Sequence, residues 1–132
     1  MQYPPLPIFE RIENTKHIKS WGAEFWLANN EEYCGKILRF DKKGGKCSNH
    51  IHRDKKEHFF CNSGSFILTY INGQTAQKLT KIINPGDIVE IPRMLPHQIE
   101  CIEPGDIYEF STHHEENDSY RVEPGDGQVN SV

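Results

Sequence analysis

The chain has 132 residues, of which 36% are hydrophobic and 26% are charged, as is typical of one soluble globular domain with a single core. Its formal net charge of -4 comes without the cluster of basic residues that a phosphate backbone requires, which excludes a nucleic-acid partner from our expectations. No apolar run reaches the roughly 18 residues that span a bilayer, so no membrane partner is expected.

Residues 1–20 are predicted to form an N-terminal arm, because a proline-rich start is followed by a short polar stretch. This start lacks the basic head and apolar stretch of a signal peptide. The four cysteines are scattered, with no Cys-x-x-Cys pair. Free thiols and a cytoplasmic location are therefore expected.

From residue 21 onward the pattern indicates β structure. Short alternating or β-branched runs are separated by turns rich in Gly, Pro and Asn, and no stretch has a helical period. The expected strands cover residues 24–27, 35–40, 46–52, 57–61, 65–71, 77–83, 88–92, 97–102 and 107–111. Asn72-Gly73 is a strong hairpin signal between two of them. The sequence thus predicts a single all-β domain, a sandwich or barrel, over residues 21–122, and a flexible tail over 123–132.

A candidate metal centre combines two of these strands with a later loop. His50 and His52 are two apart, so strand alternation places both side chains on the same face. Glu57 begins the next strand after a four-residue polar turn, and His97 follows a proline-rich loop. Three imidazoles and a carboxylate suit one divalent ion among Zn, Mn, Fe, Co and Ni, and the ligand types do not choose among these. The alternative is that these histidines are surface or hydrogen-bonded residues.

The wider spacing favours the metal reading. It reads Gly45-x4-His50-x-His52-x4-Glu57-x6-Gly64, followed by Gly86-x5-Pro92-x4-His97. This resembles the two sequence motifs of the cupin superfamily, except that cupins often have Gly where this chain has Met94. The resemblance implies a cupin-type jelly-roll β-barrel with one metal at its axis. The implied ligands are His50, His52, Glu57 and His97, although a cupin that keeps these residues without a metal is the alternative.

A closer resemblance covers about residues 21–121 and is to the cupin domain of type II mannose-6-phosphate (phosphomannose) isomerases. Four segments carry it, namely Trp21 to Trp26, Gly45 to Phe59, Gly86 to His97, and Glu109 to Thr112 with Glu116 to Arg121. That family typically has Gln where this chain has His50, so the metal set here is fuller. The resemblance implies a metal-dependent sugar or sugar-phosphate isomerase that interconverts aldose and ketose through an enediolate.

Several residues are candidates for the chemistry of such an enzyme. Alternation back from His50 predicts that Ser48 and Lys46 lie on the inner face, where Lys46 could contact a phosphate or hydroxyl group. Arg121 matches the closing arginine of the family and could clamp a phosphate. Glu57 could double as a base, and Glu109 could face the substrate. His58, on the opposite face from Glu57, is expected to be structural, and His113 and His114 are expected to be solvated.

Two other functions stay open: another metal-dependent cupin enzyme, such as an oxygenase or epimerase, and a non-catalytic carbohydrate-binding cupin. A homodimer is expected, because barrels of this kind pair through edge strands, and residues 21–27 are the candidate contact.

Overall fold

A computed structural model describes residues 2–123. Of the tail predicted at 123–132, residue 123 ends a strand, and residues 124–132 lie outside the described residues. Strands dominate this part of the chain, with two short 3-10 helices, η1 (Ile12–Thr15) and η2 (Glu116–Asp118). The strands are β1 (Lys16–Lys19), β2 (Gly22–Asn29), β3 (Cys34–Phe40), β4 (Asn49–His52), β5 (Glu57–Cys61), β6 (Ser65–Ile71), β7 (Lys78–Ile83), β8 (Ile88–Ile91), β9 (His97–Glu103), β10 (Gly105–Ser111) and β11 (Ser119–Glu123). Within residues 2–123, no helix has the length and apolar character needed to cross a membrane.

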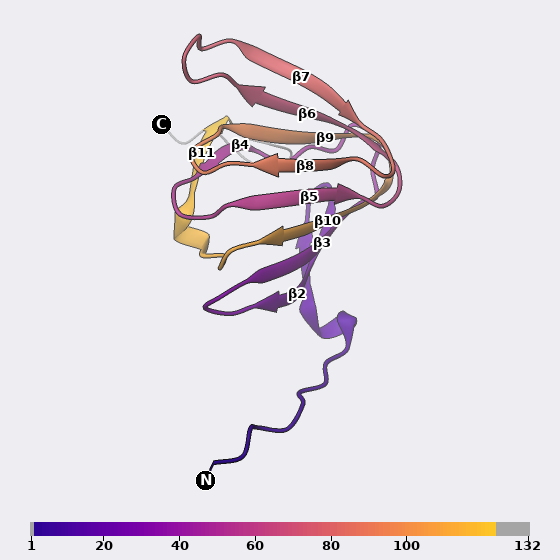
Figure 1. The fold of residues 1–132 in the computed structure, drawn as a ribbon. Coiled ribbons are helices and arrows are strands. Elements are labelled where there is room, and N and C mark those ends of the chain that lie inside the picture. Colours follow the sequence, from indigo (N-terminus) through magenta and orange to yellow (C-terminus); the bar gives the residue numbers. More distant parts are fainter. Residues whose placement is uncertain (1, 124–132) are drawn as a thin grey trace.

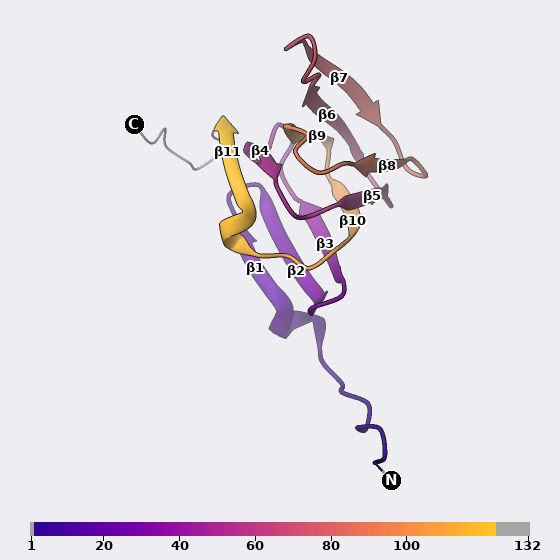
Figure 2. The ribbon, with the colours of Figure 1, turned by 60° about the vertical axis from the view of Figure 1, so that its left-hand side comes forward.

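The strands form two antiparallel sheets that face each other (Figures 1 and 2). The first sheet has the order β1-β2-β3-β10-β5-β8, and the second has the order β11-β4-β9-β6-β7. Although β1, β2 and β3 are consecutive, most other neighbours come from distant parts of the sequence, such as β3 beside β10 and β11 beside β4, as in the jelly roll. The predicted all-β jelly-roll barrel is confirmed.

The core lies between the sheets because the inward positions of the strands are apolar. Burial alternates along β3 and β9, as it must where one face meets the core and the other meets water. The ring of Trp21 stacks on Phe40 with centroids 4.3 Å apart. Cys61 and Cys101 are buried in this core, where each packs as a small apolar residue.

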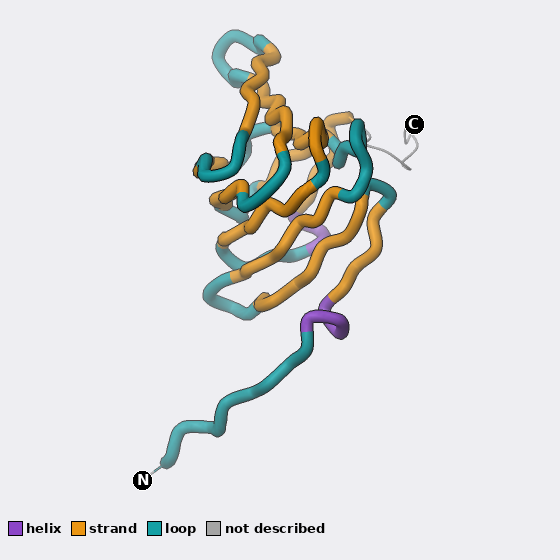
Figure 3. Tube along the Cα trace, turned by 90° about the vertical axis from the view of Figure 1, so that its right-hand side faces the viewer, coloured by secondary structure: helices purple, strands orange, loops and turns teal. Residues whose placement is uncertain are grey.

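The N-terminal region departs from the prediction of a simple arm. Residues 16–19 form β1, which pairs with β2 in antiparallel register. The preceding residues extend away from the barrel (Figure 3). Since β1 occupies the edge of the sheet, β2 is flanked on both sides, and Trp21 is buried. The segment 21–27 is therefore not the free edge that the expected dimer contact required.

Candidate metal centre

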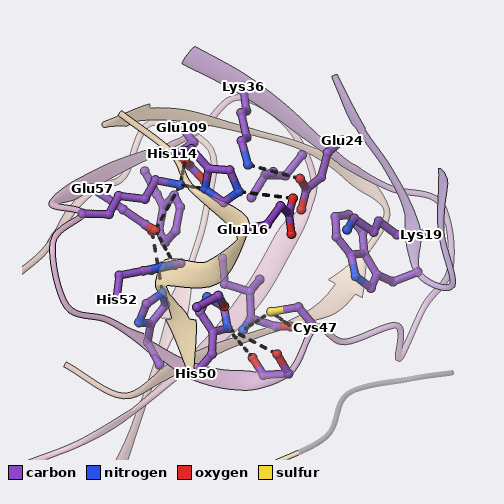
Figure 4. A pocket seen from close by; sticks show the side chains of 18 of the residues that line it. Lys19, Glu24, Lys36, Cys47, His50, His52, Glu57, Glu109, His114 and Glu116 are labelled. Carbon is purple, nitrogen blue, oxygen red and sulfur yellow. Dashed lines mark hydrogen bonds and ion pairs between the residues drawn. The ribbon is translucent and has the colours of Figure 1, made fainter. Parts of the chain in front are cut away.

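A cavity of about 440 Å³ opens into the barrel between the two sheets. Its wall includes the predicted ligands and also Lys36, Lys55 and His114. Figure 4 shows His50, His52 and Glu57 on one side of this space, with Glu24 and Lys36 across from them. The predicted ligands thus share one cavity.

The three histidines are brought together by the pairing of β4 and β9. His50 and His52 lie on β4, and His97 is the register partner of His50 at the start of β9. One nitrogen from each ring can be chosen so that all three lie within 4.8 Å of one another. This group could hold a metal ion.

Main-chain carbonyls orient all three imidazole rings. Each Nδ1 lies within hydrogen-bond distance of a carbonyl oxygen: His50 to Ser48 at 2.9 Å, His52 to Asp118 at 3.3 Å and His97 to Leu95 at 2.8 Å. A carbonyl oxygen only accepts, so Nδ1 carries the proton and the neutral ring keeps its lone pair on Nε2. Outer hydrogen bonds of this kind fix metal-binding histidines.

Glu57 closes the group from β5, where its side chain is 2% exposed. Its Oε1 lies 2.9 Å from Nε2 of His52, and its Oε2 lies 3.6 Å from Nε2 of His97. Metal–ligand bonds to nitrogen and oxygen are about 2.0–2.2 Å long, so two ligands of one ion lie roughly 3–3.5 Å apart. The buried Oε2 of Glu57 and Nε2 of His97 have no hydrogen-bond partner among the described residues. A divalent cation fits these facing lone pairs.

The protonation states also suit a cation site. Burial, followed by the nearby rings of His97 and His52, lowers the pKa of His50 to about 3, so this ring is neutral at pH 7. Burial alone would raise the pKa of Glu57, but contacts with His52 and His97 hold it well below its usual value. Burial acts to lower the pKa of His97, yet Glu57 raises it, so metal binding competes with a proton there.

A buried lysine links Glu57 to a second carboxylate. Nζ of Lys55 lies 3.5 Å from Oε1 of Glu57 and 2.6 Å from Oε2 of Glu109, and its side chain is 2% exposed. The same nitrogen lies 2.9 Å from Nδ1 of His114. Burial lowers the pKa of Lys55, but the two carboxylates outweigh burial and raise it, so Lys55 is charged.

The pKa of Glu109 is shifted in the opposite direction from that of Glu57. Burial and then the charge of Glu57 raise its pKa, although Lys55 and Lys36 act against this. Ser111 donates its hydroxyl to Oε2 of Glu109 at 3.2 Å. Two nearby carboxylates whose pKa values are pushed apart are a frequent arrangement for acid–base chemistry.

A further ion pair forms the outer wall of the cavity. The buried Nζ of Lys36 lies 3.3 Å from Oε1 of Glu24 and 4.3 Å from the centre of the Trp26 ring. Trp26 donates its indole N–H to the same oxygen of Glu24 at 2.9 Å. This wall offers both charge signs to a polar ligand.

The structure corrects several sequence-based predictions. Ser48, Glu109 and Arg121 line the cavity, but Lys46 is not among the lining residues. The extrapolation failed because β4 begins only at Asn49 and strict alternation does not extend before it: Ser48 and its neighbour Cys47 both line the cavity. His58 is exposed, as expected for the opposite face of β5.

Sequence reasoning missed Lys55 and wrongly expected His114 to be solvated. Lys55 sits in a charged turn, and nothing local distinguishes it from its neighbours. His114 is held in a buried position by Asn29, which lies 85 residues away in the sequence. The main-chain N–H of His114 donates to Oδ1 of Asn29 at 2.9 Å, and Nδ2 of Asn29 donates to the carbonyl of His114 at 3.0 Å. Both placements depend on contacts that are distant along the chain.

Comparisons with known proteins agree on the fold. A family profile described as "Cupin domain" matches residues 37–108, more than half of the chain. A quercetin 2,3-dioxygenase of Aspergillus japonicus is 36% identical over 55 residues, which are 42% of this chain and 15% of that protein.

Solved structures with a similar fold include two oxalate decarboxylases. One from Bacillus subtilis has a TM-score of 0.74 and 18% identity, covering 84% of this chain and 31% of that one. One from Lactobacillus farciminis, in complex with formate, has a TM-score of 0.76 and 16% identity, covering 91% of this chain and 38% of that one. The chain therefore spans well under half the length of each of these proteins.

Proposed function

This chain belongs to the cupin family, and on that premise we propose that it is a metal-dependent enzyme acting on a small polar molecule in the barrel cavity. One observation carries the proposal. Three oriented imidazoles and Glu57 converge in the cavity, and the buried Lys55–Glu109 pair lies directly beside them. A centre built only for stability would not need a second carboxylate with a raised pKa at this place.

His50, His52, Glu57 and His97 would hold the ion. A divalent metal there would polarise a substrate oxygen and stabilise negative charge that develops on it. Glu109 lines the cavity and is the proposed proton carrier, because burial and the charge of Glu57 raise its pKa and so favour the protonated form more than at an ordinary carboxyl group. Lys55 orients this carboxylate through the contact of 2.6 Å between Nζ and Oε2.

The reaction class proposed first is that of the named relatives, an oxygenase or a decarboxylase. The local identity of 36% to a dioxygenase supports it, and so does the fold shared with oxalate decarboxylases. The buried cations Lys36 and Lys55 suit a substrate that is rich in oxygen and carries negative charge.

Isomerisation of a sugar or sugar phosphate is the second candidate. Its support is the likeness of four segments to phosphomannose isomerases, together with Ser48, Glu109 and Arg121 in the cavity wall. In this reaction Glu109 would take a proton from the carbon beside a carbonyl and return it to the neighbouring carbon. Arg121 would bind a phosphate. Lys46 has no part here because it does not line the cavity.

One set of assays separates the two candidates. The metal-loaded full chain is incubated with oxalate and related carboxylic acids while carbon dioxide is measured, and with flavonols while oxygen uptake is measured. Aldose and ketose phosphates are incubated in D₂O and followed by NMR for deuterium at C2. Turnover that Glu109→Gln lowers by about 10²–10⁴-fold supports the proposal and identifies the class. Full metal loading without turnover in any assay would contradict an enzymatic role.

A further inference from the structure

The segment that follows β10 crosses the open end of the barrel and returns as β11. This strand pairs with β4, with Ser119 opposite His52 and Arg121 opposite His50 (Figure 2). Arg121, on this strand, lines the cavity. Within the same segment, Asp118 is an acidic side chain that is only 5% exposed.

The Asp118 carboxylate binds the turn between β4 and β5. Oδ1 accepts hydrogen bonds from the main-chain N–H groups of Arg53 at 3.0 Å and Asp54 at 3.1 Å. Oδ2 accepts from Asp54 at 3.2 Å and from Lys55 at 3.1 Å. One buried carboxylate therefore holds three successive amides, and hydrogen bonds to a charged acceptor are the stronger kind.

The main chain of the same residue reaches a predicted ligand. The carbonyl oxygen of Asp118 accepts from Nδ1 of His52 at 3.3 Å, which leaves Nε2 of His52 toward Glu57. Asp118 thus contacts the ring of His52 on one side and the turn that leads to Lys55 and Glu57 on the other. Figure 4 shows how close His52, Glu57 and Glu109 lie in the region that this turn supports.

We propose that Asp118 is a positioning residue for the metal centre. By binding the amides of residues 53–55, it fixes the position of Lys55 between Glu57 and Glu109. It also fixes the start of β5, where the Glu57 side chain contacts His52. The inference rests on the proposed metal centre, though not on either reaction class. A carboxylate that only stabilised the fold could be replaced at a cost in stability without a change in metal affinity.

Variants of the full chain test this role with apo protein titrated with Co²⁺. Asp118→Asn keeps the size of the side chain but offers one acceptor oxygen in place of two. We expect Asp118→Asn to weaken Co²⁺ binding by roughly 10- to 100-fold, the usual cost of losing an outer-shell partner. We expect Asp118→Ala to weaken binding at least as much. The matched control is Glu115→Gln, in the same segment, whose partner is the exposed His113; it should bind as wild type does.

Hydrogen exchange of the apo protein gives a second readout that needs no metal. The amides of residues 53–55 should exchange faster in Asp118→Asn than in wild type, with strands β6 and β9 unchanged. If Asp118→Ala does not fold, Asp118→Asn decides the question. Wild-type Co²⁺ affinity in a folded Asp118→Asn protein would overturn the inference. If the wild-type chain binds no Co²⁺, the proposed function is contradicted, and the role of Asp118 is decided by hydrogen exchange alone. Exchange at residues 53–55 that is the same in Asp118→Asn and wild type would overturn that role.

Discussion

Met94 occupies a backbone conformation that disfavours its own side chain. Its φ of +69° lies in the left-handed region, and its N–H donates to the carbonyl of His52 at 2.8 Å. The cupin motif often has Gly at this position, where a Cβ carries a steric cost of roughly 1–2 kcal/mol. The departure from the motif is therefore a local strain in the loop before His97, while the turn itself is retained.

Replacing Met94 with Gly should stabilise the protein. The side chain is 52% exposed, so little packing is lost, and relief of strain outweighs the added chain entropy of Gly by about 0.5–1 kcal/mol. Thermal unfolding should show a rise in Tm of about 2–5 °C. Met94→Ala, which keeps a Cβ, should show no such gain. A lower Tm for Met94→Gly would contradict this account.

His114 should make stability depend on pH. Burial, followed by the charges of Lys55 and Lys36, lowers its pKa from 6.5 to about 4 in the folded protein. Between these values the unfolded chain binds a proton that the folded chain does not, so the free energy of unfolding falls as the pH falls. Across this pH range, the free energy of unfolding falls by on the order of 2–3 kcal/mol.

The variant His114→Gln isolates this effect. Urea unfolding of the apo protein from pH 7 to pH 4 should show a shallower decline for the variant than for wild type. Equal slopes for wild type and His114→Gln would show that the buried ring does not titrate as expected.

At the level of elements, the turn between β5 and β6 depends on glycine. Gly64 has a φ of +76°, and a Cβ there would lie 2.5 Å from the carbonyl oxygen of Glu103. Gly64→Ala should therefore destabilise the protein by about 1–3 kcal/mol in urea unfolding. Gly73, in the turn between β6 and β7, has open space around it, so Gly73→Ala should be close to neutral. Equal effects of the two substitutions would contradict the steric explanation.

The elements also show how far sequence patterns reach. Alternation along β5 correctly predicts that Glu57 and Phe59 point inward while His58 points outward, because the period is local to one strand. The same rule failed at Lys46, which precedes the start of β4. It could not detect Lys55, since burial of a turn residue depends on Glu109 and His114, more than 50 residues away.

At the scale of the whole molecule, the family motif predicted the barrel and the shared position of its ligands. It carried no information on the strand at residues 16–19, whose pairing with β2 changes which edge of the first sheet is free. The homodimer remains a prediction. The edge strand β1 is now its proposed contact in place of residues 21–27.

Solution mass tests that contact. Ile18 is 82% exposed on β1, and light scattering with size-exclusion chromatography should give twice the chain mass for wild type. Ile18→Lys should shift the protein to monomer. Ile82→Lys, on the edge strand of the other sheet, should stay dimeric. A wild-type monomer at high protein concentration would contradict the predicted assembly.

Metal content per chain tests the four-ligand centre most directly. Elemental analysis of the dialysed full chain should find about one divalent ion per protein, consistent with one mixed nitrogen and oxygen site. His52→Ala and His97→Ala should lose it, whereas His58→Ala, on the outer face of β5, should keep it. A folded His52→Ala protein that retains the wild-type metal stoichiometry would contradict the proposed metal centre.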